Sequence, residues 1–260
     1  MPARAPRPRP RRRPRQIVAM GGGGFSMEPD NPLLDDFILS LTGKARPRVC
    51  FVPTASGDDP AYIVSFYDAL ATRSVASHLP LFARRGEEIG PFLLAQDVIY
   101  VGGGNTENML AVWRVHGVDR ALRAAWEAGV VLAGLSAGSL CWFETGTTDS
   151  FGTALEPLSG GLGLLPGSHC PHYDGEPNRR PVYQRLIAEG LPAGYAADDG
   201  AALHFVGTEL REVVSSRPEA FAWRVELREG EVVETRLPTR YLGSAGARPP
   251  RPPRPGSRPG

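Results

Sequence analysis

The feature that most limits the possible folds is a regular alternation of short apolar runs with segments of helical periodicity. The apolar runs are nearly continuous and lie at residues 16–21, 48–56, 78–83, 97–103 and 130–135. Apolar residues recur at helical spacing in the segments between them, at residues 33–41, 61–72, 106–116 and 118–128. Strands that are apolar along their whole length are buried on both faces. The order therefore predicts an α/β fold in which helices sandwich a mostly parallel sheet.

The pattern changes in the last part of the chain. Residues 211–216, 221–227 and 231–237 alternate apolar and polar side chains, as half-buried strands do. Residues 228–232 contain a Glu-Gly pair suited to a tight turn. We therefore expect C-terminal antiparallel strands that extend or cap the parallel sheet.

Charge is distributed unevenly along the 260 residues, although the net formal charge is only +1. Residues 1–16 and 244–260 together hold eleven arginines and no acidic residue. The interior then has 18 basic and 28 acidic residues, a net charge of about −10, which disfavours nucleic-acid binding. Because both ends have too few apolar residues to offset the entropy cost of ordering, we expect disordered Arg/Pro tails at 1–16 and 244–260 around one catalytic domain at 17–243.

The three cysteines, Cys50, Cys141 and Cys170, follow neither a disulfide framework nor the spacing of a metal site. No apolar run has the length of a signal peptide core or of a membrane span. We therefore predict a cytoplasmic protein that uses no metal or other cofactor and binds no membrane.

A candidate nucleophile lies directly after the last apolar run. Gly134 to Gly138 read Gly-Leu-Ser-Ala-Gly, which matches the G-x-S-x-G pattern of a nucleophile elbow. In such an elbow a buried strand turns sharply into a helix, and the small residues two before and two after the serine relieve crowding. The sequence therefore predicts Ser136 as a nucleophile at the sheet edge.

A second glycine-rich turn follows the preceding apolar run, at residues 102–104. Adjacent parallel strands place such loops side by side at their carboxyl ends, where α/β proteins bind ligands. Backbone N–H groups there can donate to an acyl oxygen, and one such donor contributes roughly 3 kcal/mol to transition-state stabilisation. We assign the amides of Gly104 and Ala137 as the expected oxyanion hole.

These motifs resemble peptidase family S51, which contains dipeptidase E and cyanophycinase. The resembling stretches are VGGGNTENML, GLSAGSLCWF, TTDSFG, LGLLPGSHCPHYDGEP and AADDGAAL. The resemblance implies a fold similar to class I glutamine amidotransferases, which are flavodoxin-like, with a serine in place of their cysteine. It also implies metal-independent peptide hydrolysis. We expect a small peptide as the substrate and leave open whether the chain is a monomer or a homodimer.

The resemblance implies the general base as well. The family's histidine follows a proline about 35 residues after the serine, and His172 follows Pro171 here. An imidazole can accept a serine proton near neutral pH. For the other histidines, at positions 78, 116, 169 and 204, we expect structural roles.

The third member of the triad is an acid. The family's pattern is a glutamate followed by glycine, and Asp199 before Gly200 stands at the matching position. The adjacent Asp198 is an alternative, and so is Asp149 in the TTDSFG stretch. Any of these carboxylates could orient the imidazole and stabilise its charged form. We prefer Asp199.

Dipeptidase E prefers peptides with an N-terminal aspartate, which calls for a cation in the pocket. Arg179 and Arg180 follow the histidine motif, and either could pair with a substrate carboxylate. A solvated surface pair is the competing interpretation of these arginines.

Other functions are compatible with parts of the pattern. An α/β-hydrolase esterase shares the elbow but orders its triad Ser, Asp, His, whereas the order here is Ser136, His172, Asp199. A nucleotide-binding module would need G-x-G-x-x-G, and the glycine run at 21–24 lacks the last glycine. A cyanophycinase-like hydrolase and a catalytically silent binding protein on the same fold remain as alternatives.

Overall fold

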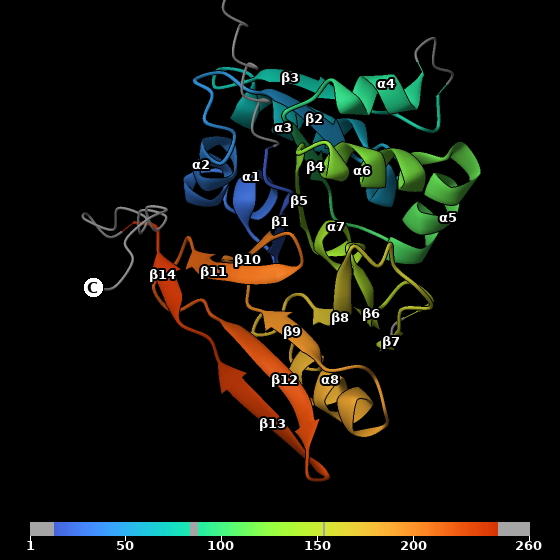
Figure 1. Ribbon diagram of the computed structural model, residues 1–260, viewed down its shortest axis with the longest axis vertical. Coiled ribbons are helices and arrows are strands. Elements are labelled where there is room, and N and C mark those ends of the chain that lie inside the picture. Colours follow the sequence, from blue (N-terminus) through green and yellow to red (C-terminus); the bar gives the residue numbers. More distant parts are fainter. Residues whose placement is uncertain (1–12, 84–87, 153, 244–260) are drawn as a thin grey trace, which may run out of the picture.

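The computed structural model describes residues 13–83, 88–152 and 154–243, which form two β-sheets with surrounding helices (Figure 1). The main sheet has eight strands, which in spatial order are β14 (Thr239–Tyr241), β11 (Glu209–Ser215), β10 (Ala201–Val206), β1 (Gln16–Met20), β5 (Val131–Leu135), β4 (Val98–Val101), β2 (Arg48–Val52) and β3 (Val75–His78). Five neighbouring strands are parallel to one another, in the spatial order β1, β5, β4, β2, β3. Strand β10 pairs antiparallel with both β1 and β11. The predicted α/β fold with a mostly parallel sheet and C-terminal antiparallel strands is confirmed.

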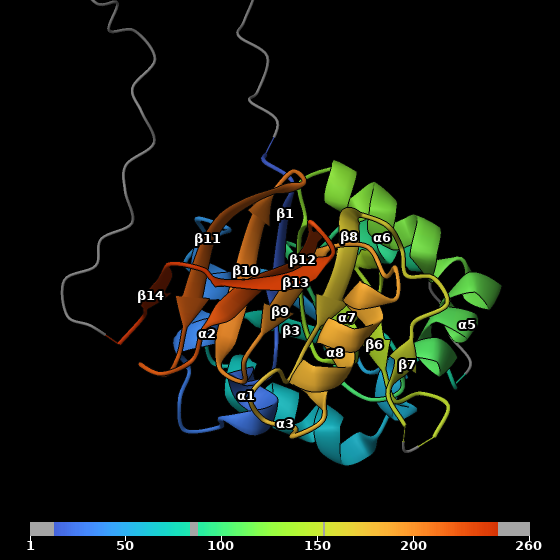
Figure 2. The same ribbon diagram turned by 90° about the horizontal axis from the view of Figure 1, so that it is seen from below.

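Helices cover both faces of the main sheet, because alternate residues of its buried strands point to opposite sides. One face packs against α1 (Gly24–Met27), α2 (Leu33–Ser40) and α3 (Pro60–Leu70). The other packs against α4 (Ile89–Leu94), α5 (Thr106–His116), α6 (Val118–Glu127) and α7 (Ala137–Leu140). In Figure 2, α2 and α6 lie on opposite sides of β1.

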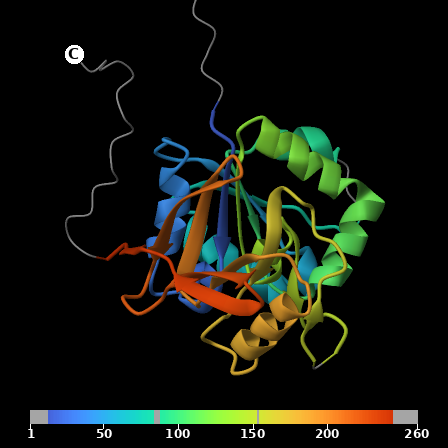
Figure 3. The same ribbon diagram turned by 60° about the horizontal axis from the view of Figure 1, so that its bottom comes forward.

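The second sheet was not predicted. Its six strands, in spatial order, are β13 (Glu231–Arg236), β12 (Ala222–Arg228), β9 (Gly194–Ala197), β8 (Leu165–Cys170), β6 (Phe143–Thr148) and β7 (Glu156–Pro157). Helix α8 (Arg179–Ala188) packs on β12 and β13, and Figure 3 shows it beside the red hairpin. The C-terminal strands therefore divide: β11 extends the main sheet, whereas β12 and β13 form the edge of the second one.

One expected strand is displaced. Residues 78–83 were expected to form a strand, but β3 spans Val75–His78 and pairs with β2. The chain leaves the sheet where Pro80 follows, since a proline has no N–H to donate to a strand ladder.

The expected tails fall largely outside the described residues, which exclude 1–12 and 244–260. The end of the first one, however, contacts the domain. Arg13 forms an ion pair with Asp97 at 3.0 Å, the Arg15 guanidinium lies over the Trp126 ring, and Gln16 begins β1. Residues 13–16 therefore differ from the disordered tail expected for them.

Among the described residues, none of the helices combines the length and the apolar character needed to cross a bilayer.

Candidate active site

Ser136 occupies a sharp turn between β5 and α7. Its backbone has φ 54° and ψ −119°, a conformation that non-glycine residues rarely adopt. A Cβ at Gly134 would lie 2.2 Å from the Gly138 carbonyl oxygen, and one at Gly138 would lie 2.3 Å from that of Val101. Close backbone packing explains both glycines of the G-x-S-x-G pattern, and the turn has the geometry of a nucleophile elbow.

His172 lies just beyond β8, on a turn of the second sheet. Its Nδ1 is 2.6 Å from Oδ1 of Asp199, and both side chains are largely buried. Asp199 belongs to the connection between β9 and β10, which joins the second sheet to the main one. A short bond from Nδ1 leaves Nε2 as the ring nitrogen available to a reacting group.

The Asp199 carboxylate fits between two glycines. A Cβ at Gly22 would lie 2.1 Å from Oδ1, and one at Gly175 would lie 2.3 Å from Oδ2. The backbone of the aspartate is also fixed, because its N–H donates to Asp174 at 2.7 Å and its carbonyl accepts from Arg217. The glycine run after β1 thus makes room for a carboxylate.

The two alternative acids have other partners. Both oxygens of Asp198 accept hydrogen bonds near β12, from the Phe221 N–H at 2.9 Å and the Trp223 indole at 3.3 Å. Burial raises the pKa of Asp198 to about 6. Asp149 pairs with Arg179 at 3.5 Å. Of the three candidate acids, Asp199 is the one that the structure pairs with His172.

Ser136 and His172 line the same pocket, which has a volume of about 330 Å³. Its remaining lining residues are Gly104, Asn105, Asp149, Ser150, Glu176 and Arg179. The residues come from four separate stretches of the chain, which the fold brings to the carboxyl ends of β4 and β5 and the end of β8.

The glycine loop after β4 leaves one amide without an acceptor. The N–H groups of Gly102, Gly103 and Asn105 donate to the Val52 carbonyl, the Tyr62 hydroxyl and the Ala55 carbonyl. Within the described part of the chain, the amide of Gly104 has no such partner, and neither does that of Ala137 at the start of α7. These are the two donors expected for the oxyanion hole.

Gly104 requires glycine for two reasons. Its φ is 135°, and a Cβ there would lie 2.2 Å from the Ala55 carbonyl oxygen. The loop therefore approaches the backbone of η1 (Thr54–Ser56) more closely than any side chain would permit.

The two candidate arginines differ in position. Arg179 is buried and lines the pocket, with its Nε 2.6 Å from Glu176. Arg180 is half-exposed, pairs with Glu234 and lies over the Trp223 ring, on the hairpin side. The structure thus brings Arg179 to Ser136 and His172 and leaves Arg180 elsewhere.

Sequence reasoning missed three lining residues. Asn105 accepts a hydrogen bond from Asn108 N–H as the cap of α5, and its side chain donates to the carbonyl of Ser150. An asparagine directly before a helical run is a recognisable cap. No local pattern places Ser150 or Glu176 beside it.

Three other histidines have structural surroundings. His169 is buried, with Ser139 Oγ 3.0 Å from Nε2 and the Tyr195 carbonyl 3.1 Å from Nδ1, and its burial lowers its pKa to about 3. His204 contacts Gln16, and His78 contacts Tyr67.

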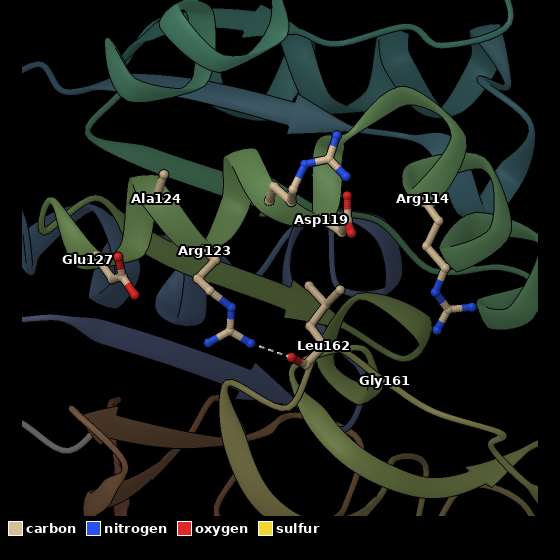
Figure 4. A pocket seen from close by; sticks show the side chains of 8 residues that line it. Arg114, Asp119, Arg123, Ala124, Glu127, Gly161 and Leu162 are labelled. Carbon is tan, nitrogen blue, oxygen red and sulfur yellow. Dashed lines mark hydrogen bonds between the residues drawn. The ribbon is translucent and has the colours of Figure 1, made fainter.

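A second pocket, of about 290 Å³, lies between α6 and the loop before β8 (Figure 4). Its lining residues are Arg114, Asp119, Arg120, Arg123, Ala124, Glu127, Gly161 and Leu162. Arg123 donates to the Leu162 carbonyl, which fixes the loop to the helix. This lining has charged groups but neither a nucleophile nor a histidine, so the candidate active site is the pocket of Ser136.

Comparison with known proteins identifies the family. The model of peptidase family S51 matches residues 17–213, most of the described chain. The chain belongs to peptidase family S51. It is therefore a peptidase, and a serine nucleophile fits this family.

Several S51 relatives match over most of their length. The chain is 55% identical over 231 residues to YgaJ, an uncharacterized peptidase of Bacillus subtilis (strain 168), with 88% of this chain and 100% of YgaJ covered. It is 30% identical to Peptidase E of Pasteurella multocida (strain Pm70), with 69% and 79% covered.

A solved structure shares the S51 fold. The crystal structure of a peptidase from an acI-B1 Actinobacterium matches with a TM-score of 0.67 at 19% identity, covering 88% of this chain and 96% of that one. The fold is the flavodoxin-like arrangement related to class I glutamine amidotransferases, as expected.

Proposed function

We propose that the chain is a serine peptidase of the dipeptidase E type, which hydrolyses short peptides with Ser136, His172 and Asp199 as its triad. The observation that carries this proposal is the 2.6 Å bond between His172 Nδ1 and Asp199, because His172 and Ser136 line the same pocket. A carboxylate on Nδ1 holds the imidazole in the tautomer whose Nε2 can accept a proton.

In this mechanism His172 accepts the Ser136 hydroxyl proton as the serine oxygen attacks the scissile carbonyl. The developing oxyanion accepts hydrogen bonds from the amides of Gly104 and Ala137. The amine leaves with the proton from His172, and water then attacks the acyl-enzyme with the same histidine as base. Asp199 stabilises the imidazolium.

The lining of the pocket supports a peptide substrate. It contains charged groups, from Asp149, Glu176 and Arg179, and the exposed carboxylates suit the ammonium group of a short peptide better than the apolar chain of a lipid ester. The half-exposed Arg180 is turned to Glu234 and takes no part in the proposed substrate contacts.

The test is a comparison of the wild-type protein with Ser136→Ala on a panel of dipeptides. We expect kcat to fall about 10⁶-fold, and a fluorophosphonate probe to label only the wild-type protein, with unchanged thermal unfolding. Ser65→Ala is the matched control, because that hydroxyl lies on the exposed side of α3, where it donates to the Ala61 carbonyl. A Ser136→Ala protein that keeps full activity would overturn the proposal, and turnover of esters without peptides would favour an esterase.

A further inference from the structure

The guanidinium of Arg179, the cation in the pocket, is already neutralised within the protein. Its Nε lies 2.6 Å from one oxygen of Glu176, and its Nη2 lies 3.3 Å from the other. The same Nη2 is 3.5 Å from Asp149, and Nη1 donates to the carbonyl of Thr147. A bidentate carboxylate and a second acid thus occupy the Nε and Nη2 donors of this guanidinium, on the side where it could bind a substrate carboxylate in a bidentate manner.

Exposure shows which of these groups a ligand meets. The side chain of Arg179 is 4% exposed, whereas those of Glu176 and Asp149 are 46% and 57% exposed. Two negative charges surround one positive charge, and the negative ones are the accessible ones. The pocket is therefore anionic on the surface that faces a substrate.

We propose that this pocket selects against an acidic residue before the scissile bond, so that the peptidase prefers peptides whose first residue is neutral over those that begin with aspartate. This inference rests on the proposed function and specifies its substrate. A substrate carboxylate beside Glu176 and Asp149 would face like charges in a partly desolvated site, which costs binding energy. The ammonium group of a peptide's first residue, in contrast, is complementary to them. Arg179 then acts as a positioning residue that fixes the two carboxylates.

The test compares Asn-Leu with Asp-Leu, two dipeptides that have nearly the same shape and differ in one charge. For the full-length wild-type protein we expect kcat/KM to be at least ~10-fold higher for Asn-Leu. Added salt should reduce this ratio, because screening weakens the repulsion. Glu176→Gln should also reduce it, because one negative charge is lost and Arg179 becomes available to the substrate.

Glu234→Gln is the matched control. It also removes a carboxylate from an arginine, but that arginine is Arg180, outside the pocket, so the ratio should not change. The affinities of Ser136→Ala protein for the two dipeptides, measured by calorimetry, should show the same preference and do not depend on turnover.

Equal or faster hydrolysis of Asp-Leu by the wild-type protein, or equal or tighter binding of Asp-Leu to Ser136→Ala protein, would overturn the inference while the proposed function stands. If Ser136→Ala binds Asn-Leu more tightly and the wild-type protein hydrolyses neither dipeptide, the inference is supported and the proposed function fails.

Discussion

Asp198 and Asp199 are neighbours in the chain, yet their carboxylates enter different networks. Asp199 bonds to His172, which lines the candidate active-site pocket, and Asp198 accepts from Phe221 and Trp223 near the β12 strand. In extended chain, successive side chains point to opposite sides. The Asp199 side chain therefore faces the candidate active site, and the Asp198 side chain faces the second sheet.

This difference predicts that an Asp→Asn substitution lowers activity at position 199 but not at position 198. Asp199→Asn should lower kcat by about 10³- to 10⁴-fold, because the amide no longer holds the required imidazole tautomer or stabilises its charge, and should leave thermal unfolding nearly unchanged. Asp198→Asn serves as the control: it keeps activity in the folded protein. Steady-state kinetics and thermal melts of both variants check this. Loss of catalysis in Asp198→Asn alone would contradict the assignment.

At the scale of elements, the loop after β4 is held from several sides. The Tyr62 hydroxyl, on α3, accepts the Gly103 N–H at 3.2 Å, and Ala55 accepts that of Asn105. A Cβ at Gly102 would lie 2.9 Å from the Tyr62 ring, so the ring also packs on the loop. Helix α3 therefore fixes the loop that carries the Gly104 amide.

The described residues between β6 and β8, 149–152 and 154–162, are fixed in a comparable way. Ser150 accepts hydrogen bonds from the Thr106 and Glu107 amides at the start of α5, and the Glu107 carboxylate in turn accepts from Ser159. Arg114 donates to the carbonyl of Gly160. The segment that supplies Asp149 and Ser150 to the pocket thus runs along α5.

We predict that Tyr62→Phe lowers kcat by ~3- to 10-fold with little change in KM. The substitution removes the acceptor of the Gly103 amide, so the adjacent oxyanion donor is less well positioned. Affinity for a peptide aldehyde, which forms a tetrahedral adduct with serine, should fall in parallel. Tyr67→Phe is the control, because Tyr67 lies on the same helix as Tyr62 but its hydroxyl contacts His78 of β3, away from the loop. A variant with unchanged kcat and weaker substrate binding would contradict the proposed role of Tyr62.

At the scale of the whole molecule, the candidate active site lies where the two sheets meet. Ser136 ends a strand of the main sheet, His172 follows a strand of the second, and Asp199 lies on the connection between them. The proposed triad therefore forms only when both sheets are in place, and its assembly depends on the stability of the complete domain.

One buried acid links that stability to pH. Asp35 is 1% exposed and accepts a hydrogen bond from Tyr100, and burial raises its pKa from 3.8 to about 6. The raised value means that the folded state favours the protonated form. The stability that this group provides is fully present below about pH 4 and is lost as the pH rises through about 6.

We therefore predict that Asp35→Asn stabilises the folded protein most at neutral pH. Relative to the wild-type protein, its free energy of unfolding should increase between pH 4 and pH 7, by roughly 3 kcal/mol. Asp36→Asn, at an exposed neighbouring position, should show no comparable trend. Urea titrations of the three proteins at several pH values check this. A constant difference between Asp35→Asn and the wild-type protein would contradict the raised pKa.

Much of this molecule follows from local patterns in the chain. Nearly continuous apolar runs such as 130–135 determine buried parallel strands, because only a sheet covered on both faces excludes water from them. Gly134, Ser136 and Gly138 determine the elbow, since the backbone contacts at both glycines leave no room for a Cβ. The resemblance to the S51 family selected His172 and Asp199.

Tertiary structure decided what local patterns leave open. The division of the C-terminal strands between two sheets, the choice of Asp199 over Asp198, and the neutralisation of Arg179 by Glu176 and Asp149 all depend on contacts between distant segments. Residue type and spacing show that a charged side chain is present. The effect of that charge on a ligand depends on which partners surround the side chain and how much water reaches it. These properties exist only once the chain has folded.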